Sequence, residues 1–180
     1  MKPRLNLSRP FPKHFKEHLA ALIIGVLFAT SALGQVEIKQ YQIEGVIDGD
    51  TLHVRDPSVR ASYRVRLAMI DAPEKAQTYG IESKSALQQL LRGQATVTLH
   101  VYDEDRYNRL IAVVVDERGR NINLELVNQG AAWVYDRYAR ARTYSDLYPA
   151  FVNAQNTARA RQLGLWRSSP PTPPWEFRRK

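Results

Sequence analysis

Two segments between residues 35 and 70 alternate apolar and polar residues in the manner of β-strands. Residues 35–54 alternate loosely around an Asp-Gly pair at positions 48–49, which predicts a hairpin because both central positions of its turn need positive φ. Residues 63–70 predict a third strand with one buried face, since alternate positions are apolar. Those apolar positions are Val65, Leu67 and Met69. Asp71-Ala72-Pro73 is expected to end this strand.

Three later segments space their apolar residues at about 3.6 positions, which predicts helices. These helices are expected over Gly80–Leu91, Asn121–Gln129 and Leu147–Gln162, each stopped by a nearby glycine. Thr96–Val101 and Leu110–Val115 predict two more strands, the second central because it is continuously apolar. Five β runs with helices after the third and fifth do not alternate as in a doubly wound sheet. We therefore expect an α+β, mainly β fold, a small closed barrel with helices outside it.

The ends of the chain differ from its middle. Residues 1–34 are arranged like a signal peptide, with a cationic start, the apolar run Leu19–Ala29, and small residues at 32 and 34 for cleavage before Gln35. This predicts a secreted or periplasmic protein whose folded domain spans residues 35–167. The alternative is an uncleaved membrane tether, although the apolar stretch is shorter than the ~20 residues needed to span a bilayer.

Residues 168–180 are rich in proline, so we expect a C-terminal tail in which no packed helix or central strand can run. The tail ends in Trp175-Glu-Phe-Arg-Arg-Lys, which either packs back on the barrel or reaches nucleic acid. The sequence does not choose between these two interpretations.

Composition narrows the classes of function. A chain of 180 residues leaves room for one folded domain, and the absence of Cys excludes a disulfide framework, a zinc ribbon and a thiolate nucleophile. Any metal must therefore be bound by oxygen or imidazole ligands. The net charge is +8, of which +4 remains in residues 35–180, where most of the cations are Arg. This balance favours a polyanionic partner only weakly.

Acidic residues cluster at two predicted turns. Asp48 and Asp50 lie two positions apart on the hairpin and project to one side in extended geometry, while Asp71 follows the third strand. Carboxylates held together repel unless a cation joins them, and such a set with a backbone carbonyl and water suits Ca²⁺ or Mg²⁺. Glu74 lies near enough to act on a bound water as general base. The cations expected to address a substrate phosphate are Arg66 and Arg109.

Each segment also has an ordinary structural interpretation. Residues 48–51 are typical of a turn, and residues 71–74 of a strand end. Arg66 is equally typical of a solvated strand face, and Arg109 beside Asp105 is typical of a surface ion pair that contributes little. His53 and His100 lie in strand patterns without a partner at ligand spacing, so we do not expect them to bind a metal.

Taken in order, these segments resemble the thermonuclease family, the exported nucleases similar to staphylococcal nuclease. The likeness extends over residues 40–166. The motifs that carry it are Val-Ile-Asp48-Gly-Asp50-Thr-Leu, Arg66-Leu-x3-Asp71-Ala-Pro-Glu74, Asp105-Arg-Tyr107-Asn-Arg109-Leu, Asn123-Leu-x-Leu-Val-x2-Gly130-x2-Trp-Val-Tyr135 and Gly164-Leu-Trp166.

The resemblance implies a five-stranded OB-fold barrel with about three flanking helices and Ca²⁺-dependent hydrolysis of DNA and RNA by a monomer, single strands preferred. It implies that Asp50 and Asp71 bind one Ca²⁺ with the backbone carbonyl of Ala72, that Asp48 acts through water, and that Glu74 is the general base. The residues implied to contact substrate are Arg66 and Arg109, which clamp phosphate, and Arg106, Tyr107 and Tyr135.

Two details depart from a simple reading of this pattern. Asn108 stands where the family usually has Gly, and Asn tolerates the left-handed backbone that the loop needs. Strict alternation places Arg66 and Asp71 on opposite faces of a strand, so a bend or bulge is expected between them.

Two rival functions remain at the level of sequence, a non-catalytic nucleic-acid-binding barrel and an oligosaccharide-binding barrel. Clustered acids disfavour the first, because they repel phosphate and simple binding does not need them. Dependence on Ca²⁺ or salt would disfavour the second.

Overall fold

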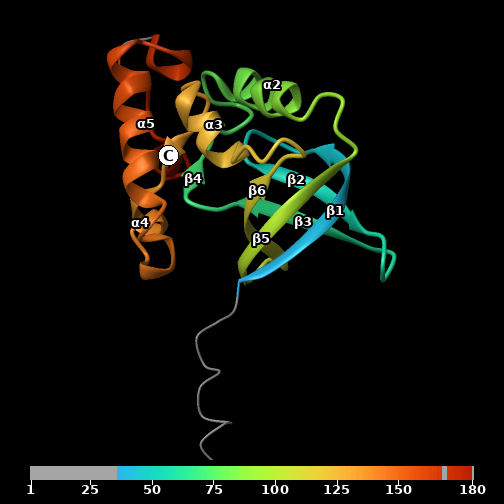
Figure 1. The fold of residues 1–180 in the computed structure, drawn as a ribbon. Coiled ribbons are helices and arrows are strands. Elements are labelled where there is room, and N and C mark those ends of the chain that lie inside the picture. The colour runs from blue at the N-terminus through green and yellow to red at the C-terminus, as the bar shows by residue number, and fades with distance from the viewer. Residues whose placement is uncertain (1–35, 168–169, 180) are drawn as a thin grey trace, which may run out of the picture. The chain divides into compact units, whose positions relative to one another are not determined.

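The computed structural model describes residues 36–167 and 170–179, and its centre is a five-stranded barrel (Figure 1). Its strands are β1 (Glu37–Val46), β2 (Thr51–Asp56), β3 (Ala61–Leu67), β5 (Thr96–Glu104) and β6 (Arg109–Val115). The barrel closes in the order β1-β2-β3-β6-β5, and only the β3–β6 pair is parallel. The barrel and the five predicted strands are confirmed, and β6 pairs on both sides, with β3 and β5, as every strand of a closed barrel does.

Alternation along the strands places one set of side chains inside the barrel. Val65 and Leu67 of β3 are buried there, as their shared parity predicts, together with Leu52 and Leu99 from neighbouring strands. Arg64 and Arg66 occupy the intervening positions of β3 and are exposed or half-buried. The outer face of β3 therefore presents two arginines beside a filled apolar core.

The hairpin between β1 and β2 forms, but its turn differs from the predicted one. The Ile47 N–H donates to the carbonyl of Thr51 at 2.9 Å across a three-residue connection, and neither Asp48 nor Gly49 has positive φ. Gly49 is required for space instead, since a Cβ there would lie 2.1 Å from Ser83 Oγ and 2.7 Å from Ala72 Cβ. The Asp-Gly pair is thus a site of close packing.

The expected bend after the third strand is present. β3 ends at Leu67, three residues earlier than predicted, because Met69 adopts a left-handed φ of 69°. The chain then enters β4 (Ile70–Asp71), which pairs with β7 (Trp133–Val134) in a small second sheet. This turn carries Asp71 off the barrel and onto the side where Arg66 points.

Three helices match the predicted ones within a few residues, namely α2 (Gly80–Leu90), α3 (Ile122–Asn128) and α5 (Tyr148–Ala160). Figure 1 shows α2 and α3 over one end of the barrel, with α5 packed against α3. Gly130 follows α3 with a φ of 68°, as a terminating glycine should, whereas α5 is followed first by left-handed Gln162. The apolar faces of these helices join the barrel core.

Four short helical elements of residues 36–167 and 170–179 were not predicted. They are α4 (Asp136–Ala139), α6 (Pro174–Phe177) and the 3₁₀ turns η1 (Arg142–Tyr144) and η2 (Gly164–Arg167). The expectation that no helix packs in the tail is wrong for α6, because Pro174 lies in its first turn, where no backbone N–H is needed. The described part of the tail packs back on the domain, the first of its two interpretations.

The predicted signal peptide lies outside the described residues. Within residues 36–167 and 170–179, no helix has both the length and the apolar content required to cross a bilayer.

Candidate active site

Two buried aspartates form the centre of the site. Asp50 precedes β2 and is 6 % exposed, while Asp71 in β4 is 1 % exposed. Asp50 Oδ2 accepts a hydrogen bond from the Ala72 N–H at 2.6 Å, which ties the hairpin to the segment that leaves the barrel. Asp48 Oδ1 accepts from the Asp50 N–H at 3.1 Å, so Asp48 supports the turn from outside.

Arg66 joins the two aspartates. Its Nη1 lies 3.1 Å from Asp50 Oδ2, and its Nη2 donates to Asp71 Oδ1 at 2.8 Å. Burial raises the pKa of Asp50 to about 7 against the opposing effect of Arg66, and the negative charges of Asp48 and Asp71 raise it further. One guanidinium therefore does not fully compensate the acids gathered here.

Glu74 reaches the same centre through a residue from the far end of the chain. Arg178 Nη2 donates to Asp71 Oδ2 at 2.7 Å, and Arg178 Nη1 donates to Glu74 Oε1 at 2.6 Å and to Asp71 Oδ1 at 3.2 Å. The hydrogen bond to Asp71 is the main reason that the pKa of Arg178 is raised above its usual range. Because one guanidinium spans both acids, Asp71 and Glu74 lie close together.

A tight loop after β5 orients Arg109. Asp105 Oδ2 accepts from Arg109 Nε at 2.8 Å, and Asp105 Oδ1 accepts from the Tyr107 and Arg109 N–H groups. Asn108 adopts the left-handed φ of 56° that its position suggested. In the parallel β3–β6 ladder, Arg109 lies opposite Arg64. Because Arg64 and Arg66 are two positions apart in β3, all three arginines lie on the same face.

Aromatic residues lie near these arginines. Arg106 donates to the Tyr107 hydroxyl at 2.7 Å, and both Arg106 and Arg109 lie over the Tyr107 ring, which is 54 % exposed.

Tyr135 lies elsewhere, directly after β7, and its N–H donates to the carbonyl of Met69 at 2.8 Å. The Tyr135 ring stacks on Trp175 of the tail, with centroids 5.1 Å apart and an interplanar angle of 4°.

The donor atoms suit a hard cation. Asp50, Asp71 and Glu74 offer only oxygen, and the Ala72 carbonyl accepts no hydrogen bond from residues 36–167 or 170–179. However, no group of three or more described acidic or histidine side chains is already placed around one point. Two guanidiniums, Arg66 and Arg178, supply the positive charge instead. The residues fit Ca²⁺ by chemistry, and binding it requires Arg178 to give up Asp71.

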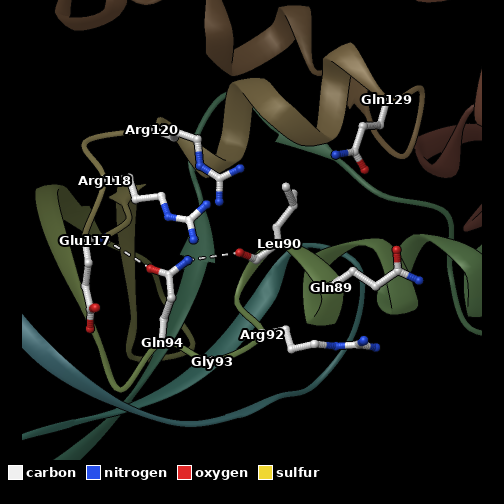
Figure 2. Close-up of a pocket in the computed structure, with 9 residues that line it drawn as sticks. All are labelled: Gln89, Leu90, Arg92, Gly93, Gln94, Glu117, Arg118, Arg120 and Gln129. Carbon is white, nitrogen blue, oxygen red and sulfur yellow. Dashed lines mark hydrogen bonds between the residues drawn. The ribbon is translucent and has the colours of Figure 1, made fainter.

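A separate polar cavity of about 360 Å³ lies between α2 and the turn after β6 (Figure 2). Its charged lining residues are Arg92, Glu117, Arg118 and Arg120. Arg120 is already paired with the buried Asp116 at 2.7 Å, and Gln94 crosses the cavity floor to bond Leu90 and Glu117. None of the residues predicted for the site lines this cavity, so it is distinct from the acid cluster.

Three residues that position or cover the site were not assigned roles from the sequence. Asn123 is fully buried, and its amide bonds the carbonyls of Ala68 and Ala112 and the Val114 N–H, which fixes the turn before Asp71. Arg178 and Trp175 come from the tail. A buried Asn inside an apolar helix pattern was a usable signal for the first, but nothing local in the sequence indicates what the tail contacts.

Comparison with known proteins shows which family the chain is similar to. The family model described as "Staphylococcal nuclease homologue" matches residues 64–168. A protein of Escherichia coli O157:H7 described as an "Uncharacterized endonuclease" is 41 % identical over 75 % of this chain and 82 % of its own length. One of Haemophilus influenzae with the same description is 40 % identical over 88 % and 82 %. A "Probable staphylococcal-like nuclease" of Oryza sativa subsp. japonica is 38 % identical over 65 % of this chain but 33 % of its own length.

Proposed function

The chain belongs to the staphylococcal nuclease family and is a nuclease, and we propose that it is exported and hydrolyses phosphodiester bonds of DNA and RNA with the help of one Ca²⁺. The observation that carries the proposal is that Asp50 and Asp71, from two different segments, both contact the guanidinium of Arg66, while Arg178 joins Glu74 to Asp71. Export rests on the signal-like pattern of residues 1–34, and the mass of the mature chain, beginning at Gln35, tests it.

The metal would be held by the side chains of Asp50 and Asp71 and by the Ala72 carbonyl, with Asp48 acting through water. A bound Ca²⁺ supplies charge stabilisation at the phosphate and positions a water molecule. The burial of Asp50 close to Asp48 and Asp71 supports this assignment, because a bound cation would offset the cost of keeping these carboxylates charged.

Glu74 is 40 % exposed at its side chain, whereas Asp50 and Asp71 are buried, so a water can approach Glu74 more easily than either aspartate. It would accept the proton of the attacking water as a general base. Arg66 and Arg109 lie on one face of neighbouring strands and would donate to the non-bridging oxygens as negative charge develops on them. Exposed Tyr107 and Arg106 would contact the flanking nucleotide.

A binding protein without catalysis is the rival, and the cluster of acids argues against it. Burying two aspartates beside a third acid costs stability and repels a polyanion, so simple binding gives no reason to keep them. A nuclease has such a reason, because it needs carboxylates to hold a cation and to act as a base at the phosphate.

A digestion assay of the full chain on single-stranded DNA tests the proposal. Activity should require Ca²⁺ and stop with EDTA. Glu74→Gln and Arg109→Ala should each lower turnover by about 10²-fold or more, since each removes an interaction made in the transition state. Glu82→Gln, an exposed acid on α2, is the matched control and should leave turnover unchanged.

Melting temperatures of all variants show whether the fold persists. Digestion that survives chelation would refute the metal assignment. Full turnover by Glu74→Gln would refute the role of general base.

A further inference from the structure

The described end of the tail lies on the proposed active site. The Thr172 carbonyl accepts a hydrogen bond from Gln77 Nε2 at 2.5 Å, and Pro174 is buried at the start of α6. The segment, red in Figure 1, reaches β4, where Arg178 bonds Asp71. Side-chain hydrogen bonds thus join the tail to residues that lie far from it in the sequence, 95 positions away for Gln77 and Thr172 and 107 for Asp71 and Arg178.

Arg178 takes up the atoms that the proposed reaction needs. Both oxygens of Asp71 accept from Arg178, and Oδ1 also accepts from Arg66. Glu74 Oε1, on the proposed general base, accepts from the same guanidinium at 2.6 Å. With these bonds in place, both oxygens of Asp71 and one oxygen of Glu74 already accept from guanidinium groups.

Trp175 covers the aromatic part of the site in the same way. Its indole lies parallel to the Tyr135 ring and edge-on to Trp133, with centroids 5.1 and 5.7 Å away. A nucleobase stacked on Tyr135 would occupy the same space, since stacking on an aromatic ring is how proteins hold unpaired bases. The tail therefore presents a flat ring and a cation where a nucleotide and a metal would bind.

The tail is built to hold this position at low entropic cost. Prolines at 170, 171, 173 and 174 restrict the segment before α6, and Pro173 has an extended backbone with φ −63° and ψ 146°. Trp175 and Arg178 are three positions apart, so one turn of helix places them on one face. Arg178 itself remains 42 % exposed, which leaves it free to be displaced.

We propose that residues 170–179 are an inhibitory segment that occupies the active site, with Arg178 competing with the cation for Asp71 and Glu74 and Trp175 competing with a nucleobase for Tyr135. The inference rests on the proposed function. Substrate and cation must shift the segment from a closed to an open position, so their apparent affinities fall by the fraction of open molecules.

Arg178→Ala in the full chain tests this, with Arg179→Ala as its matched control. Both variants lose one positive charge at neighbouring positions, but Arg179 makes no ion pair with any residue in 36–167 or 170–179. Arg178→Ala should bind Ca²⁺ about 3- to 30-fold more tightly by calorimetry, and Arg179→Ala should match the unaltered chain.

A second readout needs no metal. In EDTA, fluorescence anisotropy should show a single-stranded oligonucleotide binding more tightly to Arg178→Ala than to Arg179→Ala, because their net charge is equal and only the first opens the site. Trp175→Ala should shift oligonucleotide affinity in the same direction as Arg178→Ala.

Equal behaviour of Arg178→Ala and Arg179→Ala in both measurements would overturn the proposal. A fall in turnover of Arg178→Ala at saturating Ca²⁺ and DNA, as large as that of Arg109→Ala, would also overturn it, since Arg178 would then be part of the catalytic machinery. If the nuclease assay fails, the anisotropy comparison in EDTA still tests the inhibitory segment. The proposed function and the inhibitory segment can therefore be refuted independently.

Discussion

Each arginine of the site is defined by the carboxylates it contacts. Arg66 is 14 % exposed at its side chain and bridges two buried aspartates, so it cannot leave without exposing uncompensated charge in the interior. Arg109 pairs with the half-exposed Asp105, which orients the guanidinium and leaves it accessible to a phosphate. Arg178 is the most exposed of the three and comes from a short terminal helix. These differences would suit Arg66 to holding the two aspartates together beside the phosphate, Arg109 to binding the substrate and Arg178 to being displaced.

Asp105→Asn should loosen the loop that orients Arg109. Burial alone would raise the pKa of Asp105, but the hydrogen bonds from Arg109 hold it below its usual value. A lowered pKa means that this stabilisation is present above the unfolded pKa of about 4 and is lost as the pH falls through the folded value. We expect the variant to lose about 1 kcal/mol of unfolding free energy at pH 7. Its turnover should also fall, because Arg109 would no longer be oriented.

Urea unfolding between pH 7 and pH 3 measures this effect, and the difference from the unaltered chain should shrink towards acid. Asp136→Asn is the control, because Asp136 and Arg140 have the same spacing but are both exposed, and such pairs contribute little. A constant difference at every pH would contradict the role of the charge.

At the scale of elements, the sequence predicts the strands and helices that have a regular apolar pattern. It does not predict elements whose position depends on contacts with distant residues. The strands and the three long helices follow from local alternation and spacing, as Val65 and Leu67 illustrate. The early end of β3 depends on Met69 entering the left-handed region, and β4 and β7 are two residues each, too short to carry a pattern. The structure places Arg66 against both Asp50 and Asp71, but the place of Arg178 could not be inferred because it lies 107 residues from its partner Asp71.

Gly49→Ala tests the contact between the hairpin and α2. The new methyl group would meet Ser83 Oγ and Ala72 Cβ, and Ser83 is held by a 2.7 Å hydrogen bond to the Ala131 carbonyl, so neither neighbour can yield easily. We expect a loss of about 1–3 kcal/mol in unfolding free energy.

Gly45→Ala in β1 is the matched control, since nothing lies within 4 Å of its Cβ position and its φ is not positive. Thermal unfolding of the two variants should separate them clearly. Equal melting temperatures would show that the hairpin can shift away from α2, and that Gly49 is not needed for close packing.

At the scale of the whole molecule, we expect the site to reduce the stability of the domain that carries it. The barrel and helices share one continuous apolar core, and the cluster of acids at its edge places Asp50 in that low-dielectric surrounding. If the site receives a cation as proposed, it has to keep charge where the isolated fold would prefer none. The free energy of unfolding should therefore improve when that charge is removed.

Asp50→Asn should stabilise the protein in EDTA while abolishing its activity. Because burial raises the folded pKa of Asp50 to about 7, the folded state binds this proton more tightly than the unfolded state, and stability is lost as the pH rises from about 4 to 7. Asn is neutral, and its carbonyl oxygen can still accept from the Ala72 N–H, so it removes that loss. We expect a gain on the order of 1–4 kcal/mol at pH 8 and little gain at pH 4. Urea unfolding at both pH values measures the gain, and a variant less stable than the unaltered chain at pH 8 would show that Arg66 compensates Asp50 fully.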